Sequence, residues 1–496
     1  MNKRTSRSLR STEIIALSIA ISFSVSCLSG PGYHPPQTDV PPAWTDEAPA
    51  APPQAAGAVK PQPAAGPVAG PAADLTKWWR QFGDAKLTSL IEEAFQANYD
   101  LQTAQARLRQ SRALRGIAAG AFWPQLTASA AYDRVHSGSG VTGVGGLAID
   151  RDLFQAGFDA AWEIDVFGGI RQNVESAGAN VRAAEENILN TRVSLASEVA
   201  LLYAQIRGAQ QRVLIARNNL DAQQRTVDIT RKRKSVGFVS SLDVANAEAQ
   251  AATTLSQIPI LEKSARQSIN ALSVLLARPP DALLKELSDV QPLPTVSAQI
   301  PVGAPPDLLR RRPDIRQAEA LLHAAAAQIG VAEAALFPNV SVAGSLAWQS
   351  GLVRDWFSQI NLSWSVGPSV SWTFFAGGSK AANVHVQEAV RDQALIAYRQ
   401  AILTALQDVE DALVAFSKDQ ESRKALSAAV TASRQASELS TQLYIQGEAE
   451  FINVLDAERT QYASEDALVM ADIDLITDII ALYKALGGGW EAPDSK

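Results

Sequence analysis

Apolar and polar residues alternate with a period of two along several segments of the chain. From Phe154 to Val166 the even positions carry apolar side chains, while most odd positions carry small or polar ones. The same alternation recurs at 340–349 and 362–374, and we expect a matching strand after Pro124. Because successive side chains of a strand point to opposite faces, this pattern predicts four strands, each with one apolar and one polar face.

Two long runs without proline, 170–236 and 379–446, are rich in Ala, Gln, Glu and Arg. Apolar residues such as Ile402, Val409 and Phe416 keep a spacing near seven, which is typical of helices that pack side by side as a coiled coil. At about 1.5 Å per residue, one helix of this length reaches roughly 100 Å. Further helices are predicted at about 85–121, 241–278, 314–335 and 451–486.

The chain contains two copies of one structural unit. The segment that starts at Gly237 recurs 210 residues later at Gly447, and both glycines are predicted to form turns between two helices. Further matched landmarks are Trp162 with Trp372, Pro124 with Pro338, and the pair Gly168-Gly169 with Gly377-Gly378. We therefore expect two tandem repeats, at 77–290 and 291–490, followed by a C-terminal tail at 491–496.

The first residues are typical of a targeting segment. Basic residues precede an apolar stretch from Ile14 to about Val25, which is too short to span a bilayer as a mature helix. The stretch leads to Cys27, the only cysteine of the chain. The preceding residues resemble a bacterial lipobox, although Ser24 stands where leucine is usual, and the alternative is a plain signal peptide with an incidental cysteine. We predict a signal peptide at 1–26, an N-acyl diglyceride on Cys27, and a Pro/Ala-rich linker at 27–76.

The overall charge excludes one class of function. The 496 residues carry 44 basic and 51 acidic side chains, a net charge of -7, so the surface offers no electrostatic reason to bind nucleic acid. Apart from the leader, no stretch is long and apolar enough for a transmembrane helix. If the chain crosses a membrane, its strands must do so as a closed β-barrel, because lipid offers no partner for unpaired backbone groups.

Candidate catalytic and metal-binding chemistry is scarce. The histidines show no ligand spacing, and the acidic residues and serines form no recognisable catalytic set. The histidines are His34, His136, His323 and His385. A G-x-G-x-x-G match at 138–143 lacks the following helix of a dinucleotide site, so we interpret it as an extracellular loop. The arginines at 310–312 are interpreted as surface charges ahead of a helix that begins near Pro313. We expect no enzyme activity, metal or cofactor.

The strands suit either of two settings. A soluble sheet with one buried face is the commoner source of such alternation. A membrane barrel is favoured by the strand length of about 13 residues, the small hydrophilic polar face and the tryptophans near strand ends. Four strands are too few, because a barrel needs about eight or more. The chain must therefore oligomerise, and strand counting alone permits two copies or three.

Several motifs carry a family resemblance. The strongest is the run from Asp307 to Glu319, with the sequence DLLRRRPDIRQAE. Others are Trp79 with Phe82, Asn98-Tyr99-Asp100-Leu101, Ile329-Gly330-Val331-Ala332, Leu336-Phe337-Pro338 and Gly487-Gly488-Gly489-Trp490. Together they cover nearly everything from Trp78 onward. The sequence resembles the outer membrane factor (TolC-like) family, and within it the NodT- and OprM-type efflux lipoproteins.

This resemblance implies an α+β membrane protein. It implies a homotrimer with four strands per chain, whose twelve-stranded outer-membrane β-barrel continues into a long periplasmic α-helical barrel. Such a protein is lipid-anchored in the outer membrane of a Gram-negative bacterium. It is the passive exit duct of a tripartite efflux system, and its partners are a periplasmic adaptor and an inner-membrane pump, commonly of the resistance-nodulation-division type. The alternatives are an exit duct for protein or peptide secretion, and a periplasmic scaffold lipoprotein that forms no channel.

The helix-turn-helix tips are the candidate gate. In the resembled family, acidic rings at the second tip narrow the pore, and the matching positions here are Asn453 and Asp456. Asp243 holds the equivalent place in the first copy, and the turns at Gly237 and Gly447 are candidates for adaptor or pump contact. The alternative is that these carboxylates are solvated or cap nearby helix N-termini.

Overall fold

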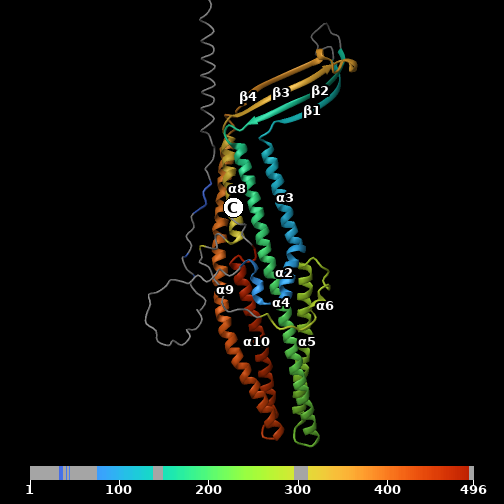
Figure 1. Ribbon diagram of the computed structural model, residues 1–496, viewed down its shortest axis with the longest axis vertical. Coiled ribbons are helices and arrows are strands. Elements are labelled where there is room, and N and C mark those ends of the chain that lie inside the picture. The colour runs from blue at the N-terminus through green and yellow to red at the C-terminus, as the bar shows by residue number, and fades with distance from the viewer. Residues whose placement is uncertain are drawn as a thin grey trace, which may run out of the picture. The chain divides into compact units, whose positions relative to one another are not determined.

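The computed structural model describes residues 33–36, 41, 44, 75–137, 149–294, 306 and 311–490. The predicted signal peptide, Cys27, the glycine-rich segment 138–143 and the tail 491–496 lie outside these residues. The chain divides into two compact units (Figure 1). The first unit comprises Met1–Gln37, Arg107–Glu185 and Gln317–Arg399, and the second comprises Thr38–Ala106, Glu186–Arg316 and Gln400–Lys496.

The first unit carries one antiparallel sheet among the described residues. Its strands follow one another in chain order, so β1 and β4 are the edge strands. They are β1 (Gln125–Ser137), β2 (Ile149–Ile164), β3 (Asn339–Ser350) and β4 (Leu362–Ser371). The register pairs Ala128 with Phe158 and Phe158 with Leu346. Leu346 pairs in turn with Trp364. The four predicted strands are confirmed, although β4 ends three residues before the predicted boundary.

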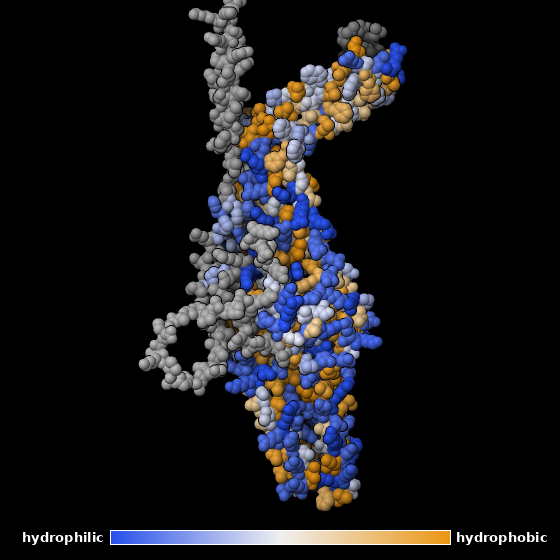
Figure 2. Space-filling model, viewed as in Figure 1, coloured by the Kyte–Doolittle hydropathy of each residue, from blue (hydrophilic) through white to orange (hydrophobic). Residues whose placement is uncertain are grey.

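The two faces of the sheet differ as the alternation predicts. On one face large apolar side chains lie exposed, and apolar residues are visible over the sheet in Figure 2. Among them, Trp364 is 71% accessible. On the other face serines pair across the strands. The hydroxyl oxygens of Ser341 and Ser369 lie 2.8 Å apart, and those of Ser345 and Ser365 are separated by the same distance. Within the part of the chain that the structure describes, nothing covers the apolar face or the two edges.

Both copies connect sheet and helices in the same way. The indole of Trp162 donates to the carbonyl of Phe122 at 2.9 Å, and Trp372 donates to Leu336 at 3.0 Å. The glycine before each long helix has φ +82° at Gly168 and Gly378, where the left-handed backbone favours glycine. Gly168 thus corresponds to Gly378, and the predicted pairing with Gly377 is wrong by one position.

The long helices have nearly the predicted bounds. The two longest, α4 and α9, contain 67 and 68 residues and join the units. The helices are α3 (Tyr99–Gly120), α4 (Gly169–Ser235), α5 (Ser241–Leu275), α8 (Pro313–Ala334), α9 (Ser379–Gln446) and α10 (Phe451–Ala485). Short elements are η1 (Leu75–Phe82), α2 (Ala85–Ala97), α6 (Leu284–Leu287), η2 (Val353–Asp355) and η3 (Gln359–Asn361). No helix of the described residues is apolar over a stretch long enough to cross a membrane.

The predicted helix 85–121 is wrong in one respect, because Asn98 divides it into α2 and α3. The backbone of Asn98 is extended, with ψ 132°. Its side-chain oxygen accepts from the amides of Asp100 and Leu101, which caps α3. Its amide nitrogen donates to the carbonyl of Leu275 at 3.0 Å. The buried side chain thereby ties the break to the end of α5.

The core of the second unit contains residues from η1 and from the C-terminal end of α10. Trp78 is fully buried and stacks on Tyr483 with ring centroids 5.2 Å apart. The Tyr483 hydroxyl donates to Gln81 Oε1 at 2.5 Å, and the Gly489 amide donates to Leu75 at 2.8 Å. The conspicuous tryptophan and glycine motifs therefore build the packing of η1 against the C-terminal end of α10.

Arg312 corrects a second prediction. Only 8% of it is accessible, so it is no surface charge. Its guanidinium donates to the carbonyl of Ala485 at 3.1 Å and pairs with Asp314 and Asp408 at 2.7 and 3.0 Å. Because the last carbonyls of a helix lack partners within it, Arg312 satisfies the end of α10. Arg311 is exposed, and Arg310 lies outside the described residues.

Gly208 sets how closely α4 approaches α10. A Cβ at this position would overlap Cδ1 of Ile473. Gly208→Ala is expected to lower the free energy of unfolding by about 1–3 kcal/mol through overpacking. Adding Ile473→Val removes the overlapping methyl and should restore part of the loss. Urea unfolding in detergent measures both, with Gly116→Ala as the control because no atom lies within 4 Å of its added Cβ. If Gly208→Ala unfolds with the same free energy as the wild type, the close approach of α4 to α10 is contradicted.

Candidate functional site: the helical tips

Two turns connect the long helices to their return helices at the tips of the second unit (Figure 1). Gly237 and Gly447 have φ +83° and +85°. The amide after each glycine reaches back five residues, from Phe238 to Arg233 and from Glu448 to Leu443, each at 2.9 Å. This is the Schellman arrangement, which favours glycine at the left-handed position. The turns lie where the sequence predicted them, while their contact with an adaptor or pump stays a prediction.

Asp243 has a defined structural partner. Its Oδ2 accepts from the amide of Ser240 at 2.9 Å, and the Ser240 hydroxyl accepts from the amide of Asp243 at 3.2 Å. This reciprocal capping box satisfies donors at the start of α5. The second copy has Glu450 in the cap position, and that side chain forms no cap hydrogen bond. Asp243 therefore stabilises its helix, and its gate role stays a prediction.

Asn453 and Asp456 lie exposed in the first turns of α10. Three residues apart, they share one side of the helix. Within the described residues the Asp456 carboxylate has neither an ion pair nor a hydrogen bond, so it faces solvent. At the repeat offset of 210, Asn453 corresponds to Asp243 and Asp456 to Asn246. Each tip therefore carries one carboxylate and one amide, in opposite order.

A row of polar side chains on α4 joins the two hairpins, and the sequence analysis missed it. Its members are Arg212, Asn219, Thr226 and Arg233, each seven residues after the previous one. Their respective partners are Asp466 at 2.7 Å, Glu465 at 3.0 Å, Glu458 at 2.7 Å, and the Tyr444 ring at 4.6 Å from its centroid. Burial raises the pKa of Glu458, which the Thr226 hydroxyl partly opposes. The seven-residue spacing of these polar side chains is the sequence signal that could have revealed this row.

Three carboxylates gather where α9 and α10 pack, namely Asp419, Asp474 and Asp478. Burial raises the pKa of Asp478 to about 7, and the hydrogen bond and charge of Asp419 and the charge of Asp474 add to the rise. Burial likewise raises the pKa of Asp474, with the Asp419 charge as the second cause. No group of acids, histidines or cysteines in the described part of the chain is arranged to hold a metal ion.

The folded chain therefore binds a proton at Asp478 more tightly than the unfolded chain. Its stabilising effect is complete below the ordinary pKa of 3.8 and is lost as the pH rises toward about 7. Asp478→Asn should flatten this decline and stabilise the protein at pH 8 by about 1 kcal/mol, since solvent screens the partly exposed site. Thermal unfolding across this pH range measures the slope, with the exposed Asp281→Asn as control. An unchanged slope in Asp478→Asn would contradict the raised pKa of Asp478.

Comparison with protein families identifies the chain's relatives. The model of the family described as "Outer membrane efflux protein" matches residues 90–278 and again residues 304–488. Nodulation protein T of Rhizobium leguminosarum bv. viciae is 33% identical over 469 residues, which cover 94% of this chain and 92% of that protein. The toluene efflux pump outer membrane protein TtgI of Pseudomonas putida is 32% identical over 410 residues, covering 82% and 86%.

Solved structures agree with these matches. The outer-membrane channel OprN is 36% identical, with a TM-score of 0.84 over 94% of this chain and all of that one. The open state of the Neisseria gonorrhoeae MtrE outer membrane channel is 27% identical, with a TM-score of 0.78 over 94% and 99%. The likeness confirms the predicted α+β channel fold, and the relatives confirm the resemblance that the sequence motifs carry.

Proposed function

Because the chain belongs to the outer membrane efflux protein family and is an outer-membrane efflux channel, we propose that three copies form its working state. The open sheet carries this proposal. Both edge strands, β1 and β4, lack a second partner within the described chain, and the apolar face is exposed. In lipid each unpaired backbone group costs several kcal/mol, so pairing β1 of one copy with β4 of the next is strongly favoured. Three copies give a closed twelve-stranded barrel.

Cysteine pairs scanned along β1 and β4 test the number of copies. The only native cysteine is Cys27, so introduced pairs report on the new contact alone once that thiol carries lipid. Oxidation of purified protein should link chains into a ladder that ends at three. Pairs placed on β1 and α5 serve as the control and should not link. A ladder that ends at two, or no ladder at any register, overturns the trimer.

The proposal extends to the partners and the anchor. The trimer serves as passive exit duct for a periplasmic adaptor and an inner-membrane pump of the resistance-nodulation-division type, and the pump supplies the energy. An N-acyl diglyceride on Cys27 anchors each chain, and the duct carries out no chemistry and needs no other cofactor. The names of relatives include toluene efflux and pyoverdine export, which supports small organic molecules as cargo.

The gate is proposed at the tips. In a trimer three copies of Asp456 form a carboxylate ring, and the Asn453 ring is neutral. Asp456→Asn is expected to lower the preference for cations in planar bilayers on the order of twofold, because it removes the fixed charge at the constriction. Asn453→Asp is the matched opposite change and should raise that preference. Unchanged ion selectivity in both variants would remove these positions from the gate.

A further inference from the structure

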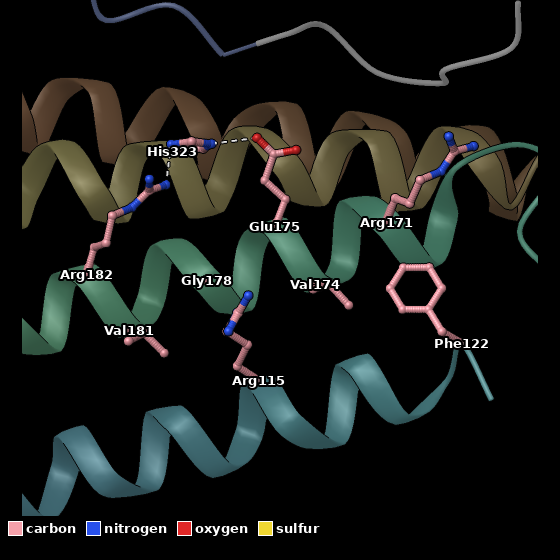
Figure 3. A pocket seen from close by; sticks show the side chains of 9 residues that line it. All are labelled: Arg115, Phe122, Arg171, Val174, Glu175, Gly178, Val181, Arg182 and His323. Carbon is pink, nitrogen blue, oxygen red and sulfur yellow. Dashed lines mark hydrogen bonds and ion pairs between the residues drawn. The ribbon is translucent and has the colours of Figure 1, made fainter. Parts of the chain in front are cut away.

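A cavity of about 530 Å³ lies within the first unit, where α3, α4 and α8 meet (Figure 3). Most of its lining comes from α4. Arg115 contributes from α3, Phe122 from the turn after α3, and His323 from α8. Gly178 has no side chain and therefore leaves the floor of the cavity open. A Cβ at this position would stand 3.6 Å from Nε of Arg115. Neither the gate nor the sheet closure uses this cavity.

The cavity is positively charged. Three guanidiniums, those of Arg115, Arg171 and Arg182, face one carboxylate, Glu175. Glu175 is already engaged, since His323 Nε2 lies 2.8 Å from its Oε1. Arg182 lies 2.9 Å from His323 Nδ1, and because arginine can only donate, the ring proton sits on Nε2.

The guanidiniums differ in their availability. Arg171 pairs with Asp165 at 3.0 Å. Arg115 has no ion pair or hydrogen bond to any residue that the structure describes, and it is exposed. Its side chain extends from α3 toward Gly178 on α4 (Figure 3). The Arg115 guanidinium is therefore free to bind an anion.

One end of the cavity borders the apolar face of the sheet. Phe122 lines it, and the carbonyl of Phe122 accepts from Trp162, which stands on the apolar face of β2. The end of the cavity at Phe122 therefore borders the face that lies against lipid in a closed barrel.

Two of the arginines lie near the helix ends that connect to the sheet. Arg171 lies in the first turn of α4, and Arg115 lies five residues before the end of α3. At about 1.5 Å per residue both lie within about 8 Å of the helix ends nearest the sheet. Four further residues separate each of these helix ends from its strand. The polar layer of a bilayer extends about 5–8 Å beyond the hydrocarbon on each side. The cavity lies between α4, which follows the inner strand β2, and α3, which leads into the edge strand β1.

We propose that this cavity binds the phosphate group of an anionic phospholipid in the periplasmic leaflet of the outer membrane, with Arg115 as the main contact. A guanidinium matches phosphate oxygens in geometry and charge. Free phosphate shares this chemistry, so the two sources must be separated by experiment. The site rests on the outer-membrane position of the sheet and is independent of the gate.

Native mass spectrometry of the purified protein with added phosphatidylglycerol tests the site. Bound phosphatidylglycerol is expected, with little phosphatidylcholine at the same concentration. Arg115→Gln should reduce binding about tenfold, which corresponds to about 1.4 kcal/mol. The matched control is Arg109→Gln, an exposed arginine six residues earlier on α3, which should bind as wild type. Gly178→Leu should block the cavity without changing its charge.

Three results would overturn the proposal. If Arg115→Gln and Arg109→Gln bind phosphatidylglycerol equally well, binding does not depend on the charge of Arg115 in particular. Full binding by Gly178→Leu would exclude the cavity. Displacement of the lipid by an equal concentration of inorganic phosphate would assign the site to a soluble anion. Pore formation and trimer mass, measured on the same samples, keep a failure of this site separate from a failure of the channel.

Discussion

Replacing Gly157 by valine is expected to prevent β2 from pairing with β3 and to abolish assembly of the channel. A Cβ at Gly157 would stand 2.7 Å from the carbonyl oxygen of Leu346 and 3.1 Å from Cα of Ala347. Both are backbone atoms, so they can move only if the strand ladder opens. In lipid each unpaired group costs several kcal/mol, so a loss of at least about 3 kcal/mol follows. Such a loss leaves almost no assembled barrel.

The measurement is the yield of heat-modifiable oligomer in outer membranes. Gly367→Val is the matched control on β4, because no atom lies within 4 Å of its added Cβ. This variant should assemble close to wild type, and Gly157→Val should not. Normal assembly of Gly157→Val would mean that the pairing of β2 with β3 differs from the register described above.

Trp78→Ala is expected to lower the free energy of unfolding of the second unit by about 3–5 kcal/mol. The side chain is fully buried against Tyr483, Trp79 and Phe82, so its loss opens a large cavity and releases η1 from α10. Trp78→Phe keeps an aromatic ring in place and should cost less than half as much.

Urea unfolding in detergent, followed by helix content, measures both tryptophan variants. A cost below about 1 kcal/mol for Trp78→Ala would be typical of a surface substitution and would contradict the packing of η1 on the end of α10.

The strands and helices could be predicted because each shows a regular hydrophobic periodicity over many consecutive residues. The alternation at 362–374 predicts a strand, and the proline-free run 379–446 predicts a helix. Each prediction needs only the residues of its own segment. The exceptions depend on distant partners. Asn98 breaks its helix where Leu275 offers a carbonyl, and Arg312 is buried because the end of α10 needs donors. Neither partner can be read from the adjacent sequence.

The candidate site was predictable only in part. The repeat located Gly237 and Gly447, and left-handed glycines at both turns agree with that prediction. The capping role of Asp243 was among the alternatives, because carboxylates are favoured near helix N-termini, but its partner Ser240 was not predicted. The raised pKa of Asp478 depends on how α9 and α10 pack. The proposed ring of Asp456 depends on contacts between copies, which no single chain contains.

Single-channel conductance of the purified protein in a planar bilayer is the decisive test of a trimeric channel, with the oligomeric mass determined on the same sample. Discrete conductance steps are expected from a protein with the mass of three chains. A soluble monomer that produces no steps would contradict the trimeric channel.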